Sequence, residues 1–344
     1  MNMLNINFQK KKSNPDTAAI MRQLSSMIHA GLPISRCFDI LEQTQVQESQ
    51  RAALRKINMH LQAGHSLHDS LRIQPEWFDP FTCRLIRLGE QSGKLDDILQ
   101  TLAAYHENNA AFRRTIRQAL FYPCLILFSS LVLSCCMFIF VIPAFAELFQ
   151  GIDKPLPLFT RIIFSISYYL SQGALPVCVL TIISAMIFLR KRRVNISRLP
   201  LIADCLQSLA IIHFCKHLAI SLSAGMPILE ALKLSSGNDQ PRELVSAIHQ
   251  LRSALSAGHN MHHAMQLHAV FPLLLQQMVK VGEESGTLDI MLNKAASLME
   301  SELNARIIHL TRLLEPLIMS VLGVLIGGLV IGMYLPVFNL GSVI

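Results

Sequence analysis

Residues 89–99 read GEQSGKLDDIL, and residues 282–292 read GEESGTLDIML, with seven of the eleven aligned positions identical. The similarity extends in both directions from this element. RQLSSMIHAGLPI at 22–34 aligns with KHLAISLSAGMPI at 216–228, and an offset of 193 or 194 residues persists through the pairs that follow. A register held over this length indicates an internal duplication, so one structural unit is used twice.

Each copy has the sequence pattern of several short helices. Apolar residues recur at intervals of three and four, as at Leu24, Ile28 and Leu32, and stop signals separate the segments. An Ala-Gly-hydrophobic-Pro element predicts a helix that ends at a glycine and a new helix that starts at a proline. These residues are Gly31, Pro33, Gly225 and Pro227. We expect six helices per copy and no strands, which is an all-α fold.

The Gly-Glu-x-Ser-Gly-x-Leu-Asp element is the most specific local signal. Its second glycine is expected to form the turn between two helices, and its aspartate to lie in the first turn of the next helix, at the positive end of the dipole. Its glutamate stands at a helix end and needs a neighbouring helix start or a cation. Two interpretations of this element remain, a helix corner with a capped carboxylate and a surface that contacts a partner. The positions are Gly89, Glu90, Gly93, Leu95 and Asp96, and Gly282, Glu283, Gly286, Leu288 and Asp289.

Three uncharged stretches are long enough to cross a bilayer, which needs roughly 20 apolar residues. The predicted transmembrane helices are residues 118–146, 174–190 and 313–337, and residues 147–173 are expected to form a loop with an interfacial helix. Pro123 and Pro316 occupy matching positions near the start of the first and third spans, where we expect kinks or ends. The fold class is therefore an integral membrane protein with two duplicated six-helix bundle domains and three transmembrane helices.

Basic residues predict the orientation, because Lys and Arg beside a span are held on the cytoplasmic side. They precede the first span at Arg113, Arg114 and Arg117 and follow the second at Arg190 to Arg193. The expected segments are a basic N-terminal segment at 1–13, cytosolic bundle domains at 14–117 and 191–312, and a periplasmic tail at 338–344. The N-terminus is thus predicted in the cytosol and the C-terminus in the periplasm, around a bacterial inner membrane.

Several function classes are disfavoured by what the chain lacks. The net charge is +7, and the cations are concentrated beside the spans, which argues against direct nucleic-acid binding. Phosphate loops, nucleophile elbows and dinucleotide fingerprints are missing, so we expect no enzyme, no catalytic residue and no cofactor. His259 and His263 stand four apart, which is the spacing of two zinc ligands on one helix face, but a solvated helix face is the favoured interpretation and no metal site is predicted.

These repeated elements, together with Tyr122-Pro123, Glu315-Pro316 and the ending YLPVFNLG at 334–341, resemble the type II secretion F-domain family. That family comprises the inner-membrane platform proteins of type IV pilus, competence and type II secretion machines. Relatives commonly carry a further segment before the first domain. The secretion branch has been associated with a cation in that domain, which Arg36 and Lys94 disfavour in this chain.

The resemblance implies a passive transmission part. Its cytosolic domains would engage a hexameric assembly ATPase, and its spans would accept pilin or pseudopilin subunits, alongside other inner-membrane assembly proteins. A homo-oligomer is expected, and Gly323-x-x-x-Gly327 would let two helices in the bilayer approach closely. A multi-pass permease and a membrane signalling adaptor are the alternatives from other classes.

Overall fold

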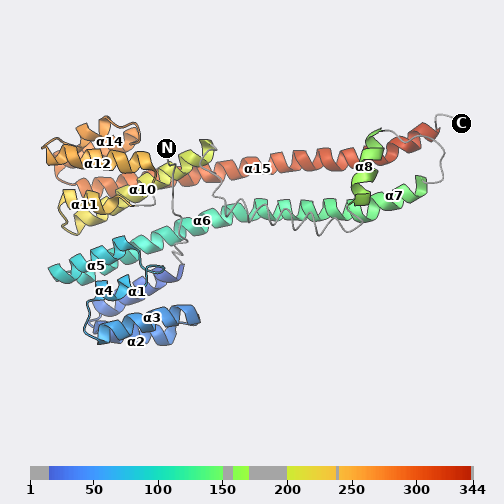
Figure 1. The fold of residues 1–344 in the computed structure, drawn as a ribbon. Coiled ribbons are helices and arrows are strands. Elements are labelled where there is room, and N and C mark those ends of the chain that lie inside the picture. Colours follow the sequence, from blue (N-terminus) through green and yellow to red (C-terminus); the bar gives the residue numbers. More distant parts are fainter. Residues whose placement is uncertain (1–14, 150–157, 170–199, 238–239, 342–344) are drawn as a thin grey trace, which may run out of the picture. The chain divides into compact units, whose positions relative to one another are not determined.

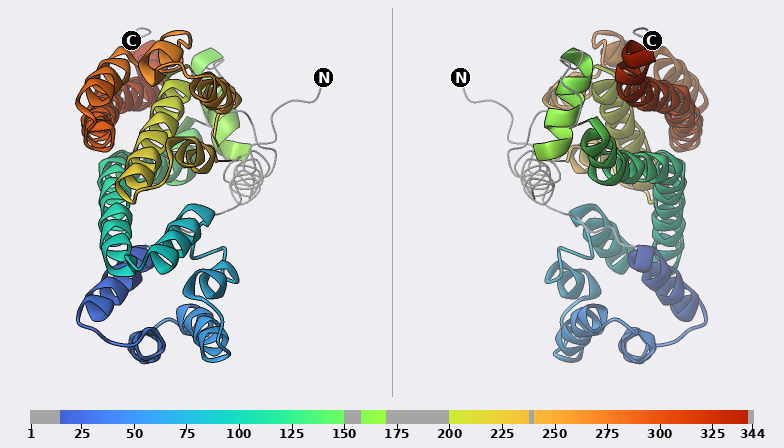
Figure 2. Two further views of the ribbon diagram at one scale, coloured as in Figure 1. Left: turned by 90° about the vertical axis from the view of Figure 1, so that its left-hand side faces the viewer. Right: turned by 90° about the vertical axis from the view of Figure 1, so that its right-hand side faces the viewer.

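A computed structural model describes residues 15–149, 158–169, 200–237 and 240–341. Within these ranges every regular element is a helix, which confirms the predicted all-α class. The same order of six helices occurs twice, first in blue to green and again in yellow to red (Figures 1 and 2). Two six-helix copies are therefore confirmed.

The helices of the two copies correspond one to one. The first copy contains α1 (Pro15–His29), α2 (Ile34–Thr44), α3 (Glu48–Gln62), α4 (Leu67–Arg72), α5 (Pro80–Ser92) and α6 (Leu95–Cys136). The second contains α10 (Pro200–Ser223), α11 (Ile228–Ser235), α12 (Arg242–Ser256), α13 (Met261–Gln266), α14 (Leu273–Ser285) and α15 (Leu288–Gly341). Between them lie the π-helix η1 (Met137–Val141), α7 (Ile142–Phe149) and α8 (Leu158–Tyr169).

The chain divides into two compact units. Unit 1 takes Met1–Thr115 and Leu201–Asn304, so it holds the bundle part of both copies. Unit 2 takes Ile116–Pro200 and Ala305–Ile344. The last helix of each copy, α6 or α15, begins in unit 1 and continues without a break into unit 2.

The first bundle is built around one apolar side chain or more from every helix. The residues at the centre are almost fully buried because the three-and-four spacing puts them on one face of each helix. They include Leu24, Phe38, Ile57, Leu71, Leu85 and Leu99. Removing one of them would lose both its transfer free energy and its packing, about 2–5 kcal/mol for a leucine replaced by alanine.

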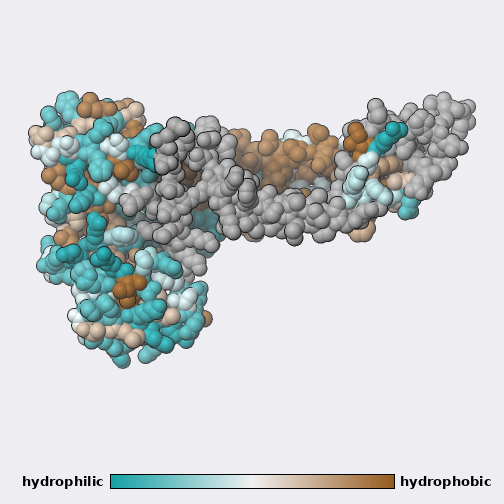
Figure 3. Space-filling model, in the orientation of Figure 1, coloured by the Kyte–Doolittle hydropathy of each residue, from teal (hydrophilic) through white to brown (hydrophobic). Residues whose placement is uncertain are grey.

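Three helices are long and apolar enough to cross a membrane. Leu95–Glu147 contains the predicted span 118–146, and Leu288–Gly332 covers residues 313–332 of the predicted span 313–337. Only 6% and 11% of their apolar windows are buried. Brown, hydrophobic residues accordingly lie open along α15 in unit 2 (Figure 3). Side chains this apolar need lipid rather than water around them.

The third helix that meets these criteria is Ala203–Ser223, which differs from the predicted second span. Its apolar window is 44% buried, and it carries Lys216 with only 8% of that side chain exposed. Phe214 and Leu218 are fully buried. A helix that is apolar on several sides because it packs in a bundle satisfies the composition test without entering lipid. The predicted span at 174–190 lies outside the described residues.

Helix α8 coincides with the expected interfacial segment and is anchored by side-chain hydroxyls. Thr160 donates to the backbone carbonyl of Gly332 at 2.7 Å, and Ser167 donates to that of Phe138 at 2.6 Å. Phe138 belongs to η1, where a π-helical turn changes the normal backbone pairing. Ile163 of α8 packs with Ile142 and Leu329. Polar groups in this apolar setting are thus satisfied within the protein.

Candidate functional site

The repeated Gly-Glu element forms the same helix corner in both copies. Gly93 and Gly286 end α5 and α14 in the left-handed region, with φ of 69° and 70°. Their N–H groups donate to the carbonyls of Gly89 and Gly282. A side chain at either position would strain the backbone, which explains the second glycine of the element.

The first glycine of the element serves a different purpose, which is close helix approach. A Cβ added to Gly89 would lie 3.1 Å from Cα of Leu95, and one added to Gly282 would lie 2.8 Å from Cα of Leu288. Gly89 and Gly282 are both buried. The corner therefore brings the backbone of one helix against the start of the next, at a distance that only glycine allows.

The glutamate of the element joins this corner to a third helix. Glu90 accepts hydrogen bonds from the backbone N–H groups of Leu67 (2.6 Å) and His68 (3.3 Å), at the start of α4. Glu283 likewise accepts from Met261 (2.6 Å) and His262 (2.8 Å), at the start of α13. The sequence predicted that either a helix start or a cation would lie beside this carboxylate. In both copies the structure places a helix start there. Glycine and glutamate together hold three helices in contact, α4, α5 and α6 in the first copy and α13, α14 and α15 in the second.

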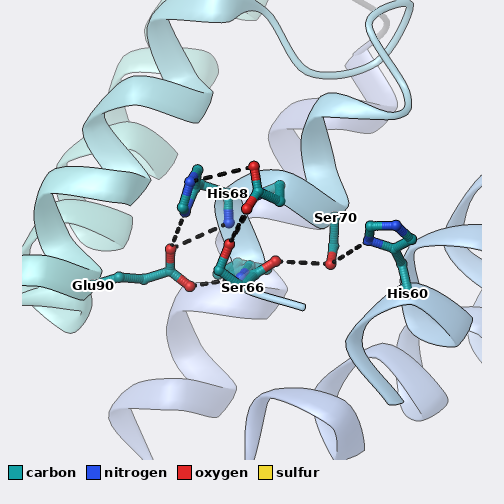
Figure 4. A network of polar contacts seen from close by, with 7 residues as sticks. His60, Ser66, His68, Ser70 and Glu90 are labelled. Carbon is teal, nitrogen blue, oxygen red and sulfur yellow. Dashed lines mark hydrogen bonds and ion pairs between the residues drawn. The ribbon is translucent and has the colours of Figure 1, made fainter. Parts of the chain in front are cut away.

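The two corners differ in their histidine, which occupies the matching positions 68 and 262. In the first copy His68 Nδ1 lies 2.6 Å from Glu90, and its Nε2 lies 3.4 Å from Asp69 (Figure 4). In the second copy His262 Nδ1 donates instead to the carbonyl of Gln276 at 3.0 Å. The first corner thus contains a side-chain network that the second replaces with a backbone contact.

The N-caps of α4 and α13 also differ. Ser66 caps α4 by accepting from the Asp69 N–H at 3.3 Å, and its hydroxyl donates to the Asp69 carboxylate. This hydrogen bond holds the pKa of Asp69 below its usual value. Asn260 stands at the N-cap of α13 but makes no side-chain cap bond. Glu283 accepts from Met261 and His262 just as Glu90 accepts from Leu67 and His68, so this contact is made with or without a capping side chain.

The aspartates of the element lie in the first turns of α6 and α15, as the sequence predicts. Asp96 accepts a hydrogen bond from His29 Nδ1 at 2.8 Å, which links α6 to the end of α1. This hydrogen bond, and then the charge of the carboxylate, raise the pKa of His29 above its ordinary value. The matching position in the second copy is Ser223, so Asp289 has no such histidine.

The Ala-Gly-hydrophobic-Pro elements form the turns after the first helix of each copy. Gly31 and Gly225 have φ of 82°, and Pro33 and Pro227 are the N-cap residues of α2 and α11. They serve the backbone path rather than a common site.

Pro123 and Pro316 lie inside helices, not at their ends. Pro123 is buried and Pro316 is exposed. Their neighbours Tyr122 and Glu315 meet, and the Tyr122 hydroxyl donates to the Glu315 carboxylate at 3.2 Å. These two residues hold matching positions in the duplication, so equivalent points of α6 and α15 face each other within unit 2.

His259 and His263, the pair that the sequence placed on one helix face, do not lie on one helix. His259 precedes α13, which begins at Met261, so the expected helical spacing of His259 and His263 is wrong. His263 is paired with Gln266 at 3.3 Å. Within the described ranges, no group of three or more histidine, cysteine, aspartate or glutamate side chains is placed to hold a metal ion.

Sequence analysis missed one repeated ion pair, which joins the first and last helices of each bundle. Arg22 of α1 donates through Nε to Glu107 of α6 at 2.6 Å, and Lys216 of α10 donates to Glu300 of α15 at 2.8 and 2.9 Å. Positions 22 and 216 are both basic and positions 107 and 300 are both glutamate. That signal was present in the duplication, but the residues lie too far apart in sequence for any local motif to show it.

Comparison with protein families decides the identity of this arrangement. The family model for type II secretion system (T2SS), protein F, matches residues 20–143 and again residues 214–336. The chain belongs to the T2SS protein F family. The two matches begin 194 residues apart and end 193 residues apart, which is the offset of the internal duplication.

Relatives with curated names cover nearly the whole chain. Type 4 fimbrial assembly protein PilC of Pseudomonas putida is 38% identical over 97% of this chain and 86% of its own length. The protein transport protein HofC homolog of Haemophilus influenzae is 31% identical, over 99% and 88%. Type II secretion system protein F of Pseudomonas aeruginosa is 27% identical, over 98% and 86%. Members of the T2SS protein F family named for pilus assembly and for secretion thus align with nearly the whole of this chain.

Proposed function

We propose that this chain is an inner-membrane platform protein of a type IV pilus, competence or type II secretion machine, where it couples a cytosolic assembly ATPase to the insertion of pilin or pseudopilin subunits. Membership in the T2SS protein F family supports a role in pilus or secretion assembly. The relatives' names include fimbrial assembly, protein transport and type II secretion.

The continuity of two helices carries this proposal. Helix α6 extends from the corner at Leu95 to Cys136, and α15 extends from Leu288 to Gly341. Each starts in a tightly packed bundle and ends in an apolar segment suited to lipid. An unbroken helix is stiff along its axis, so a displacement of the bundle is passed to the apolar segment. A transmission part needs this mechanical link.

The repeated corner supports the same role. Its two glycines and its glutamate fix the first turn of α6 or α15 to the rest of the bundle. A force applied to the bundle surface therefore reaches the long helix without being absorbed at its start. In this proposal the chain is not an enzyme, because the energy comes from nucleotide hydrolysis by the ATPase.

The proposed orientation follows the basic residues at the ends of the apolar segments. Arg113, Arg114 and Arg117 precede the apolar part of α6, and Arg306 and Arg312 precede that of α15. Both bundles, residues 14–117 and 191–312, would then face the cytosolic ATPase, and residues 338–344 the periplasm. The lipid-exposed parts of α6 and α15 would contact pilin subunits and other inner-membrane assembly proteins.

Interrupting the long helix tests this coupling. A Gly-Gly-Ser insertion after Thr115 would keep bundle and span but break the stiffness of α6 between them. We expect normal membrane levels of the protein and loss of surface fibres, or of the secreted substrate. The same insertion after Gly237, in the connection between α11 and α12, is the matched control and should preserve fibres. Normal fibres with the insertion after Thr115, or with the gene deleted, would contradict the proposal.

A further inference from the structure

The two bundles contact each other through non-equivalent faces. His217 of α10 stacks on Phe81 of α5, with ring centroids 3.8 Å apart and planes at 14°. Its Nε2 lies 2.8 Å from the hydroxyl of Tyr105 of α6. Leu234 of α11 belongs to the core cluster of the first bundle. The second bundle thus covers the α5/α6 face of the first with its α10/α11 face, inside unit 1.

Burial on the covered face is nearly complete. Phe81, Leu85, Ile98 and Tyr105 are exposed by 5%, 0%, 6% and 8%. Alongside Leu234, the partly buried Ile220, Ala224 and Met226 pack against this cluster from the second bundle. This contact is an ordinary apolar interface with one aromatic and histidine anchor.

None of the residues that the structure describes covers the equivalent face of the second bundle in this way. Adding 193 to the covered positions gives Leu274, Met278, Met291 and Leu298, and Asp97 at the rim is matched by Ile290. Leu298 is 40% exposed and Ile290 is 58% exposed, and the three others are half-buried. We call these five residues the open face. An apolar group of this kind, with isoleucine where the first copy has aspartate, is characteristic of an interaction surface.

The complementary face of the first bundle is uncovered as well. Subtracting 194 from the α10/α11 positions gives Gln23, Ser26, Ala30, Leu32 and Ile40. Gln23, Ser26 and Ala30 are exposed, and Leu32 and Ile40 are half-buried. We call these residues the α1/α2 face. Within the described part of the chain, one of two equivalent interfaces is therefore formed, and both halves of the other are left unpaired.

We propose that the open face binds the α1/α2 face of a second copy of this chain, repeating between chains the contact that joins the two bundles within one chain. Interfaces between non-equivalent faces are heterologous, so copies add head to tail and close into a ring where the rotation allows. Gln23 takes the place of His217 over Leu274 and Leu298, where the aromatic anchor is replaced by aliphatic side chains. This inference goes beyond the proposed function and does not depend on it.

Photochemical cross-linking in the full-length protein in native membranes tests the proposal. A benzoylphenylalanine replaces Leu298, and two differently tagged copies are expressed together. We expect a two-chain adduct whose partner peptide lies within residues 22–40. The same probe replacing Tyr105 should give only single-chain adducts to α10, because that contact is internal. The probe replacing Leu267, 81% exposed but outside the open face, should give no two-chain adduct.

Each other outcome overturns the proposal. An adduct to residues 273–298 of the second copy would mean a two-fold contact between open faces. An adduct only to a different protein would assign the face to another partner, and the absence of any adduct would leave it without one. As a second measurement, Ile290→Glu with Leu298→Glu should reduce the oligomer in detergent at least tenfold, while Leu267→Glu leaves it unchanged. An unchanged oligomer in the double variant would contradict the inference.

Discussion

The first and second bundles share the geometry of their helix corners but differ in the environment of their charged side chains. Both use two glycines and one glutamate to lock a helix corner, with nearly identical φ angles and matching hydrogen bonds. The ion pair between first and last helices, however, is half-exposed in the first bundle, where the Arg22 and Glu107 side chains are 42% and 41% exposed. In the second, Lys216 and Glu300 are 8% and 22% exposed. Duplicated geometry has thus been kept while the environment of its charges has changed.

That difference arises from the position of α10 between two packed surfaces. Phe214 and Leu218 are buried, Cys215 is fully buried with its pKa raised by burial, and His217 packs on the first bundle. Helix α1, its counterpart, has an open side at Gln23. A helix that contacts two partners buries its charge, whereas its duplicate leaves the same charge in water.

The largest effect is expected from breaking the buried ion pair. Lys216→Met leaves Glu300 without its cation in a mostly dry site, and the free energy of unfolding should fall by about 2–3 kcal/mol, with the partial exposure of Glu300 holding it below the fully buried case. Arg22→Met should change stability much less, since solvent screens that pair. Chemical denaturation of the detergent-solubilised chain measures both.

A double variant serves as the control. Lys216→Met with Glu300→Leu removes both charges and should recover most of the lost stability. Equal losses from Lys216→Met and Arg22→Met would show that burial does not distinguish the two bundles.

Replacing the first glycine of each corner should give the next largest effect. A Cβ at position 282 meets the Leu288 backbone at 2.8 Å, and one at position 89 meets the Leu95 backbone at 3.1 Å. Gly282→Ala should therefore destabilise by about 1–3 kcal/mol, and Gly89→Ala by less. Hydrogen exchange in α14 and α5 reports each corner separately. Gly237→Ala, where a Cβ meets nothing within 4 Å, is the control and should leave exchange unchanged.

The histidine beside each glutamate should couple to it in one copy only. His68 contacts the Glu90 carboxylate directly, so the effects of His68→Ala and Glu90→Gln should be non-additive by about 0.5–2 kcal/mol. The His262 ring bonds to a backbone carbonyl instead, and His262→Ala with Glu283→Gln should be additive within a few tenths of a kcal/mol. Two double-mutant cycles by denaturation measure this. Equal coupling in both copies would remove the distinction between the corners.

The smallest effect is a pH dependence confined to the first bundle. Since the folded-state pKa of His29 is raised, its bond to Asp96 contributes fully below a pH of about 6.5 and is lost as pH rises through the raised value. The difference in Tm between wild type and His29→Gln should therefore be larger at about pH 6 than at about pH 8.5. Ser223→Ala, at the matching position, should show no such trend. A difference that grows with pH would contradict the assignment.

Much of the fold was predictable because it rests on local and repeated signals. Gly31 and Gly93 indicate the ends of α1 and α5, which stop just before them. The duplication indicates that the same helices form in both copies. Long uncharged runs of apolar residues also indicated the apolar parts of α6 and α15. The glutamate at a helix end signalled that a neighbouring group had to receive its charge, and Leu67 and His68 provide that helix start.

The remainder depends on contacts between distant residues. Nothing near Lys216 in sequence indicates Glu300, and nothing near Phe81 indicates His217. The misassigned spacing of His259 and His263 had a local cause, since Asn260 starts α13 only after His259. The apolar composition of α10 matches that of a span because a doubly packed helix and a lipid-exposed helix both lack polar faces.

Mapping the side of the membrane on which each bundle lies would challenge this account most sharply. Single cysteines introduced into a cysteine-free variant at Ala63 and Ala257, the exposed and matching C-cap residues of α3 and α12, would be probed in intact cells with a thiol reagent that cannot cross the inner membrane. We predict that both sites react only after the membrane is opened. Labelling of position 257 in intact cells would place the second bundle away from the nucleotide and refute the proposed coupling.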